Sequence, residues 1–346
     1  MNSKEQLKIL PKVELHRHLD GSIRFDTICD LAKQNNINLG IDLSHREALW
    51  EKVKILKPMS GLQEVLDSFW ATQKVMSNYD AIKRVAYENV EDCFNDGVKL
   101  AELRFAPTFI GMNKKISFQD IIQAVVDGVN EGVDKFGIEV GLILIAARSL
   151  DINDNLEALK DARNLIKANY KGIEKLIGFD LADTENDHNP KQFLELINFA
   201  KDLGLEITIH SGEDTTAEHV INSIKLFQPK RIGHGIKVWK NQLALDLIKK
   251  NNIHLEVCPT SNWLTRCVDS LSNHPFNELY KYGISVSINS DDPHIMNINL
   301  INEYEVLSKE FGLTLNDFYK INKDSLSHSF LSSEIKTKMY KLYFSK

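Results

Sequence analysis

The sequence predicts an α/β fold, a (β/α)8 TIM barrel with a helical insertion after the first strand and with helices at the C-terminus. Three observations indicate this fold. Short apolar segments typical of buried strands alternate with longer segments of helical periodicity. Eight such strands are present, the number that closes this barrel. An open doubly wound sheet usually has a Gly-rich phosphate-binding loop after its first strand, and this sequence has none there. Because no linker rich in Pro, Gly or Ser interrupts the chain, residues 1–346 are expected to form one domain.

The composition limits the class of protein. A content of 43% hydrophobic and 26% charged residues is typical of a folded globular chain. The net charge is −6 and the basic residues are scattered, so nucleic acid is not an expected partner. We find neither an apolar run of membrane-spanning length nor a signal peptide, and the four cysteines form no Cys-x-x-Cys pair. These features predict a cytoplasmic protein with reduced thiols that makes no use of a membrane, and they leave its oligomeric state open.

The first strand is predicted over residues 13–18 and runs into a tight turn at Asp20 and Gly21. A short helix over residues 25–35 follows, and then a long helical region over residues 46–96 that contains no strand. Within this insertion, apolar residues recur at the i, i+3, i+4 and i+7 positions of a helix, namely Leu62, Val65, Leu66 and Phe69. This stripe is interpreted either as core packing or as part of a lid over the end of the first strand.

From residue 98 onward, strands and helices alternate. The strands are predicted over residues 98–107, 138–147, 176–182, 205–211, 231–234, 254–258 and 284–290. The helices between them are predicted over residues 118–136, 156–170, 191–203, 217–227, 241–251 and 275–282. Residues 300–346 are predicted to be helical and to complete the chain.

Polar side chains occupy the ends of four predicted strands. His16 and His18 lie two residues apart in the first strand, so their side chains share one face. The other strand-end residues are His210 after the fifth strand, His234 after the sixth, and Asp291 and Asp292 after the eighth. The active sites of these barrels lie at the carboxyl ends of the strands, so we expect these residues to converge there.

Four of these residues have the types and the inward parity of metal ligands. A His-x-His pair alone is weak evidence for a metal site because such pairs arise by chance. A third histidine and a carboxylate on the same rim are the stronger evidence. Three imidazoles and one carboxylate suit Zn²⁺ and leave room for a water molecule. The predicted site holds one Zn²⁺ per chain on His16, His18, His210 and Asp291.

Three further ionisable residues accompany the predicted ligands. A metal ion lowers the pKa of bound water from about 15.7 to about 7. The resulting hydroxide needs orientation and a proton acceptor, for which His234 and Asp292 are suitably placed. Glu213, just past a glycine, suits a protonated carboxyl that donates to the substrate. A closed structural zinc site would need none of these groups.

Together these motifs resemble the adenosine deaminases of the amidohydrolase superfamily. The resemblance covers residues 10–304 and rests on four motifs in the family's order: His16-x-His18-Leu-Asp20-Gly21, His210-Ser-Gly-Glu213, Arg231-Ile-Gly-His234-Gly and Asp291-Asp292-Pro. It implies that the four predicted ligands bind zinc and that Glu213 protonates N1 of the purine. It also implies that His234 and Asp292 position and activate the hydroxide that attacks C6, with loss of ammonia.

The resemblance further implies how the substrate is held. Asp20, together with His18, corresponds to the position that meets the ribose 5′-hydroxyl. Asp292 corresponds to a residue at the reacting carbon. The apolar stripe in the insertion corresponds to a gate over the purine. One position departs from the family pattern. Asp183 stands where these deaminases usually carry a glycine whose backbone N–H meets N3 of the purine. The N–H is retained, while the carboxylate is a new group beside the base.

The expected reaction converts adenosine and 2′-deoxyadenosine to inosine and 2′-deoxyinosine in purine salvage. The alternatives are deamination of adenine, N6-methyl-AMP or aminodeoxyfutalosine, and a metal-binding barrel without catalysis. Adenine deaminases tend to carry Glu, and the N6-methyl-AMP type Asn, where this chain has Asp20, which favours a nucleoside. His254 and Glu256 are interpreted as ordinary strand residues. The other histidines are interpreted as surface or loop residues: His45, His188, His219, His274, His294 and His328.

Overall fold

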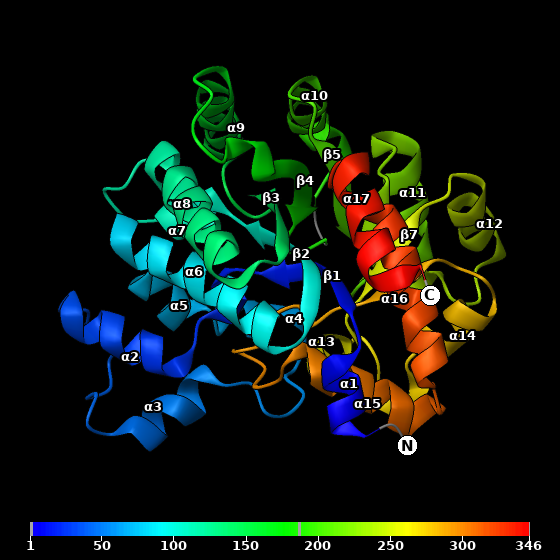
Figure 1. The fold of residues 1–346 in the computed structure, drawn as a ribbon. Helices are drawn as coiled ribbons and strands as arrows, with labels where there is room; N and C mark the ends of the chain where they lie inside the picture. Colours follow the sequence, from blue (N-terminus) through cyan, green and yellow to red (C-terminus); the bar gives the residue numbers. More distant parts are fainter. Residues whose placement is uncertain (1–2, 186–187, 346) are drawn as a thin grey trace.

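The computed structural model describes residues 3–185 and 188–345. Eight parallel strands follow one another around the sheet in the order β1 to β8. Figure 1 shows the labelled strands in the middle of the molecule. Their bounds are β1 Lys12–His18, β2 Val98–Phe105, β3 Glu139–Ala147, β4 Leu176–Ala182, β5 Glu206–Ser211, β6 Arg231–His234, β7 His254–Val257 and β8 Val286–Ile288. The predicted (β/α)8 barrel is confirmed.

The barrel closes between its first and last strands through residues just beyond β8. The N–H of His18 donates to the carbonyl of Asp291 at 2.9 Å, and the N–H of Asp291 donates to the carbonyl of His16 at 3.2 Å. Below this contact, the N–H of Leu15 donates to the side chain of Asn289 at 2.9 Å. The side chain of Asn289 therefore extends the junction where β8 is too short to pair along its whole length.

The α-helices surround the strands (Figure 1). Their bounds are α1 Lys4–Ile9, α2 Phe25–Gln34, α3 Arg46–Val53, α4 Leu62–Asp67, α5 Trp70–Val75, α6 Tyr79–Asn95, α7 Pro107–Gly111, α8 Phe118–Phe136, α9 Ile152–Lys167, α10 Leu194–Asp202, α11 Ala217–Phe227, α12 Gln242–Lys250, α13 Pro259–Leu264, α14 Phe276–Lys281, α15 Leu300–Phe311, α16 Leu315–His328 and α17 Ser333–Met339. The long insertion after β1 is helical as predicted, and it divides into α3, α4, α5 and α6. The last residue of the predicted C-terminal helical region, residue 346, lies outside the described residues.

Three short helices were not predicted: α1, α7 and α13. Both α7 and α13 begin at a proline that is separated from the preceding strand by one residue, Pro107 after β2 and Pro259 after β7. Proline fits the first turn of a helix because its missing N–H would have no partner there. The predicted strand over residues 284–290 is also shorter than expected. The N–H of Ser290 donates to Glu14 Oε1 at 3.0 Å instead of extending the sheet.

The amino end of the barrel is covered by the C-terminal helices. Asn322 on α16 accepts a hydrogen bond from the N–H of Val13 at 2.7 Å, and the ring of Phe330 lies 3.6 Å from the guanidinium of Arg231. Because this end is filled, access to the barrel is from its carboxyl end, below the insertion. Within the described part of the chain, no helix has the length and apolar character needed to span a bilayer.

Candidate active site

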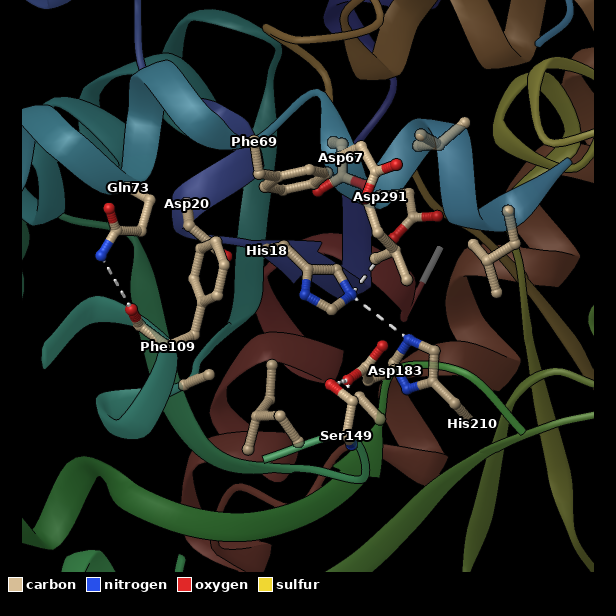
Figure 2. A pocket seen from close by; sticks show the side chains of 18 of the residues that line it. His18, Asp20, Asp67, Phe69, Gln73, Phe109, Ser149, Asp183, His210 and Asp291 are labelled. Atoms are coloured by element: carbon tan, nitrogen blue, oxygen red, sulfur yellow. Dashed lines mark hydrogen bonds and ion pairs between the residues drawn. The ribbon is translucent and has the colours of Figure 1, made fainter. Parts of the chain in front are cut away.

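Four potential ligand atoms converge at the carboxyl end of the barrel. Asp291 Oδ1 lies 3.2 Å from His16 Nε2 and 3.3 Å from His18 Nε2. The Nε2 atom of His18 is also 3.3 Å from that of His16 and 3.3 Å from that of His210. Figure 2 shows His18, His210 and Asp291 facing one another in this cluster. The structure therefore brings together the four predicted ligands from three different strands.

The donor set fits a tetrahedral metal ion. Ligand bonds of about 2.0–2.1 Å to a tetrahedral Zn²⁺ require donor atoms roughly 3.3 Å apart. The four measured separations are 3.2–3.3 Å. Three imidazole nitrogens and a carboxylate oxygen that face one another at this distance are a chemically suitable site for a borderline cation such as Zn²⁺.

Buried acids orient two of the imidazoles from behind. Nδ1 of His16 lies 2.8 Å from Glu256 Oε2, and Nδ1 of His210 lies 2.9 Å from Asp180 Oδ2. A carboxylate beside Nδ1 attracts the ring proton and leaves the lone pair of Nε2 for a metal. Arg104 joins the two acids at 2.7 Å each and, together with the histidines, keeps their pKa values low despite burial. The interpretation of Glu256 as an ordinary strand residue was therefore wrong.

The turn that follows β5 carries Glu213 into the cavity. Gly212 has a φ of +70°, a left-handed conformation that favours glycine, and it allows the chain to reverse directly after His210 and Ser211. Glu185 fixes this turn, because its carboxylate accepts hydrogen bonds from the N–H groups of Gly212 at 2.8 Å and Glu213 at 3.0 Å. Sequence reasoning did not identify this role of Glu185, whose partners are 27 and 28 residues away.

The environment of Glu213 favours its protonated form. The residue is only 5% exposed, and Oε2 lies 3.5 Å from Nε2 of His234. Burial raises the pKa of Glu213 well above its usual value, and the negative charge of Asp291 adds to the shift. A neutral carboxyl can donate a hydrogen bond, as the sequence analysis expects of this residue.

Asp292 lies against the turn that follows the first strand. A side chain on Gly21 would overlap the Asp292 carboxylate, since a Cβ there would approach Oδ1 to 1.8 Å. Glycine at position 21 therefore makes room for this acid. Burial raises the pKa of Asp292 well above its usual value, with Asp291 and Asp20 as further contributors. Its Oδ1 is buried and has no hydrogen-bond partner among the described residues, which leaves it available to a bound molecule.

The cluster opens into a cavity of about 500 Å³, within the size range of small-molecule sites. The insertion forms part of its wall, and the rings of Phe69 and Phe109 pack edge to face at 6.2 Å beside it (Figure 2). Among the predicted site residues, His16 is fully buried behind His18 and does not line the cavity. All the others line it: His18, Asp20, Leu62, Val65, Leu66, Phe69, Asp183, His210, Glu213, His234, Asp291 and Asp292.

The insertion is attached to the loops beyond β7 and β8. The N–H of Ile55 donates to the carbonyl of Ile295 at 2.8 Å, and the N–H of Met59 donates to the carbonyl of Leu264 at 2.9 Å. Val65 and Phe69 pack into a small apolar cluster with residues of those loops. The apolar stripe was interpreted either as core packing or as part of a lid. It has both properties, because it packs against neighbouring apolar residues and lines the cavity.

Asp183 adopts a left-handed backbone conformation, with a φ of +76°. Its Oδ2 accepts a hydrogen bond from the N–H of Ser149 at 3.1 Å and another from the Ser149 hydroxyl, as Figure 2 shows. Its Oδ1 accepts from the N–H of Thr184 at 2.7 Å. Because both oxygens have partners in the wall, the carboxylate is held by the protein and is not a free charge beside the base.

The barrel and the polar cluster at its carboxyl end define an amidohydrolase-type (β/α)8 barrel. The family model described as adenosine deaminase matches residues 11–343. The chain belongs to the adenosine deaminase family, whose members are hydrolases.

Individual relatives agree with this assignment. An adenosine deaminase from Clostridium botulinum (strain Langeland) is 39% identical over 336 residues, which cover 97% of each chain. The crystal structure of an adenine deaminase from Arthrobacter aurescens has a TM-score of 0.85 at 26% identity, over 96% of this chain and 97% of the other. An amidohydrolase from Burkholderia ambifaria with bound Zn has a TM-score of 0.86 at 25% identity, over 98% of this chain and 91% of the other.

Proposed function

We propose that the protein is a zinc-dependent deaminase that converts adenosine and 2′-deoxyadenosine to inosine and 2′-deoxyinosine, with release of ammonia. The carrying observation is one cavity that combines a tetrahedral donor set with the three ionisable residues Glu213, His234 and Asp292. The family membership and the relative solved with bound Zn support this proposal.

His16, His18, His210 and Asp291 would hold one Zn²⁺ per chain. When bound, the ion supplies a water molecule of lowered pKa as the nucleophile. Glu213, protonated in its buried position, donates to N1 of the purine and makes C6 a better electrophile. His234 and Asp292 orient the attacking oxygen. Loss of ammonia from C6 completes the reaction.

The charge of the cavity favours a neutral nucleoside over a nucleotide. Asp20, Asp67 and Asp183 line the cavity, and Lys74 is the only lysine or arginine in the described lining. The Nζ of Lys74 is directed elsewhere, to the carbonyl of Asn38 at 3.3 Å and over the ring of Trp70. A phosphate group carries about −1.5 to −2 charges at neutral pH, so Asp20 and Asp67 would repel a substrate such as N6-methyl-AMP.

Asp20 supports the choice of a nucleoside over a free base. Its side chain lines the cavity, and its Oδ1 is buried without a hydrogen-bond partner among the described residues. A buried carboxylate oxygen gains most from a hydroxyl donor, which the ribose supplies and adenine lacks. Asp183 is proposed to meet N3 through its N–H, and the lid residues Leu62, Val65, Leu66 and Phe69 to cover the base. We further propose a single-domain, cytoplasmic enzyme acting on small molecules.

The proposal is tested by ultraviolet assay of zinc-loaded protein. Adenosine, 2′-deoxyadenosine, adenine, AMP and N6-methyl-AMP are compared at equal concentration, with the Glu213→Gln variant as a control for contaminating activity. We expect turnover of the two nucleosides alone, and Glu213→Gln should keep zinc while losing at least about 100-fold in kcat. Turnover of adenine but not adenosine would contradict the nucleoside assignment. Absence of any turnover by metal-replete protein would favour a binding role.

A further inference from the structure

His234 is the first member of a short chain of buried polar side chains. Its Nδ1 lies 3.1 Å from Nδ2 of Asn262, and Oδ1 of Asn262 lies 3.1 Å from Nε2 of His274. The chain ends at the backbone N–H of Phe276, which donates to Nδ1 of His274 at 3.1 Å. His234, Asn262 and His274 are each at most 1% exposed. His274 lies in a loop, one of the two positions predicted for it, but it is buried and not at the surface.

The three side chains come from two segments at the carboxyl end of the barrel, the end of β6 and the connection between β7 and β8. His234 ends β6, Asn262 lies on α13, and His274 directly precedes the Pro275 that introduces α14. Only the folded barrel brings them into contact. Because all three are buried, their hydrogen-bonding atoms face one another rather than bulk water.

The direction of every hydrogen bond in this chain follows from its last member. A backbone N–H can only donate, so Nδ1 of His274 is an acceptor. Burial lowers the pKa of His274 to about 3, so its ring is neutral and carries its single proton on Nε2. That N–H donates to Oδ1 of Asn262. The amide nitrogen of Asn262, which can only donate, then faces Nδ1 of His234.

His234 Nδ1 must consequently accept, and the ring proton of His234 lies on Nε2. This nitrogen faces the polar cluster, 3.5 Å from Glu213 Oε2 and 3.9 Å from Asp291 Oδ2. A proton on Nδ1 instead would point at the amide N–H of Asn262, and two buried donors would then face each other without an acceptor. The order of donors and acceptors therefore admits only one tautomer.

We infer that Asn262 and His274 are positioning residues that hold His234 with its proton on Nε2, so that His234 serves the reaction as a hydrogen-bond donor and not as a proton acceptor. The catalytic part of this inference rests on the proposed deaminase function. Of the two residues assigned to the attacking oxygen, only Asp292 then has a free atom that can accept a hydrogen bond, its Oδ1.

The tautomer is measured directly by two-bond ¹H–¹⁵N correlation spectra of metal-free protein labelled with ¹⁵N-histidine. The His234 signals are identified by their absence in His234→Gln. We expect a protonated Nε2 and an unprotonated Nδ1 in the native protein. A protonated Nδ1 in the native protein would overturn the inference. This readout needs neither metal nor substrate.

Variants at Asn262 and at His274 test the chain of hydrogen bonds, the first by reversing its direction and the second by removing its last side chain. Asn262→Asp replaces the amide donor by an acceptor and should move the His234 proton to Nδ1, whereas the buried Asn322→Asp on α16 is a matched control that should not. With zinc and adenosine, Asn262→Asp should lower kcat roughly 100-fold and change KM by less than about 3-fold. His274→Gln keeps a donor toward Asn262 and should retain the native tautomer, while His274→Ala should give a mixture.

The outcomes separate this inference from the proposed function. The native tautomer in a protein that turns over no aminopurine would leave the positioning chain intact and contradict the deaminase assignment. An active deaminase in which neither Asn262→Asp nor His274→Ala alters the His234 tautomer would contradict the positioning chain alone. If Asn262→Asp does not fold, the pair His274→Ala and His274→Gln gives the same test.

Discussion

The N–H of His18 donates to the carbonyl of Asp291 at 2.9 Å, and Nε2 of the same histidine lies 3.3 Å from Oδ1 of the same aspartate. The backbone contact closes the barrel between β8 and β1. The side-chain contact forms one edge of the proposed metal site. Because the same two residues serve both, the proposed metal binding is expected to be coupled to closure of the barrel.

This coupling predicts that zinc stabilises the folded protein. A ligand at 100 times its Kd adds about 2.7 kcal/mol to the free energy of unfolding, so calorimetry should show a lower Tm after chelation. His210→Ala should lose both the bound zinc, measured by atomic emission, and the zinc-dependent rise in Tm. The exposed His45→Ala is the control and should bind one zinc per chain. Native zinc content in His210→Ala would remove His210 from the ligand set.

Glu256 is predicted to stabilise both the barrel and the metal site. Its carboxylate contacts His16 at 2.8 Å, Arg104 at 2.7 Å and Arg231 at 2.6 Å. Glu256→Gln would leave two buried guanidinium groups with less negative charge, which should lower the free energy of unfolding by about 3–5 kcal/mol. Loss of the acid behind His16 should weaken zinc binding about 10–100-fold in a chelator competition. Glu206→Gln, at the exposed start of β5, should change neither quantity.

Asp183 is predicted to act on stability more than on turnover. Asp183→Ala removes the hydrogen bonds to Ser149 and Thr184 and keeps a Cβ in the left-handed conformation, so urea unfolding should show a loss of about 1–3 kcal/mol. Asp183→Gly loses the same bonds without the backbone strain and should be less destabilised. Because the carboxylate is held in the wall, kcat/KM of Asp183→Gly for adenosine should stay within about 3-fold of native. A larger change would show that the carboxylate contacts the substrate.

The apolar lid residues are predicted to contribute to substrate binding. Leu62 lines the cavity, whereas Leu56, in the same insertion, is 50% exposed and does not. Loss of about 1.5 kcal/mol of apolar contact in Leu62→Ala should raise KM for adenosine roughly 10-fold. Leu56→Ala should leave KM unchanged in the same assay. Equal KM values for the two variants would contradict closure of the lid residues over the base.

Glu303 is predicted to make stability depend on pH. Its side chain is fully buried on α15, and burial raises its pKa from 4.5 to about 7. The folded state therefore binds this proton more tightly than the unfolded state, and the stability that results is present below pH 4.5 and lost as the pH rises through 7. Glu303→Gln stays neutral at every pH. The difference between its free energy of unfolding and that of the native protein should therefore increase in favour of the variant with pH, by roughly 3 kcal/mol by pH 8. Urea unfolding of both proteins at pH 5 and at pH 8 measures this difference in the free energy of unfolding. The same difference at the two pH values would contradict the prediction.

Local patterns predicted much of the fold and the residues of the site. Alternation along β1 predicted that His16 and His18 share a face, and Gly212 predicted the turn that carries Glu213. Helical periodicity located the insertion, although not its division into four helices. The helix at Pro107 was missed because a single turn of helix has no periodicity.

The partners of Glu256 and His274 could not be predicted in this way. Glu256 lies on β7 and contacts His16 on β1, 240 residues away. His274 reaches His234 only through Asn262, which lies on α13 in the same connection between β7 and β8 as His274. No local spacing in the sequence marks such contacts, since they depend on the registers of separate strands and on the paths of separate loops.

By itself, the sequence determined which residue types end each strand and which of them share a face, because side-chain direction in a strand alternates with position. Only the tertiary structure decided which buried group meets which, and hence the direction of each hydrogen bond. The separation of the ligand atoms, the burial of Glu213 and the tautomer of His234 all arise from closure of the barrel. Closure brings groups from distant segments within hydrogen-bond distance in a site where water does not separate them.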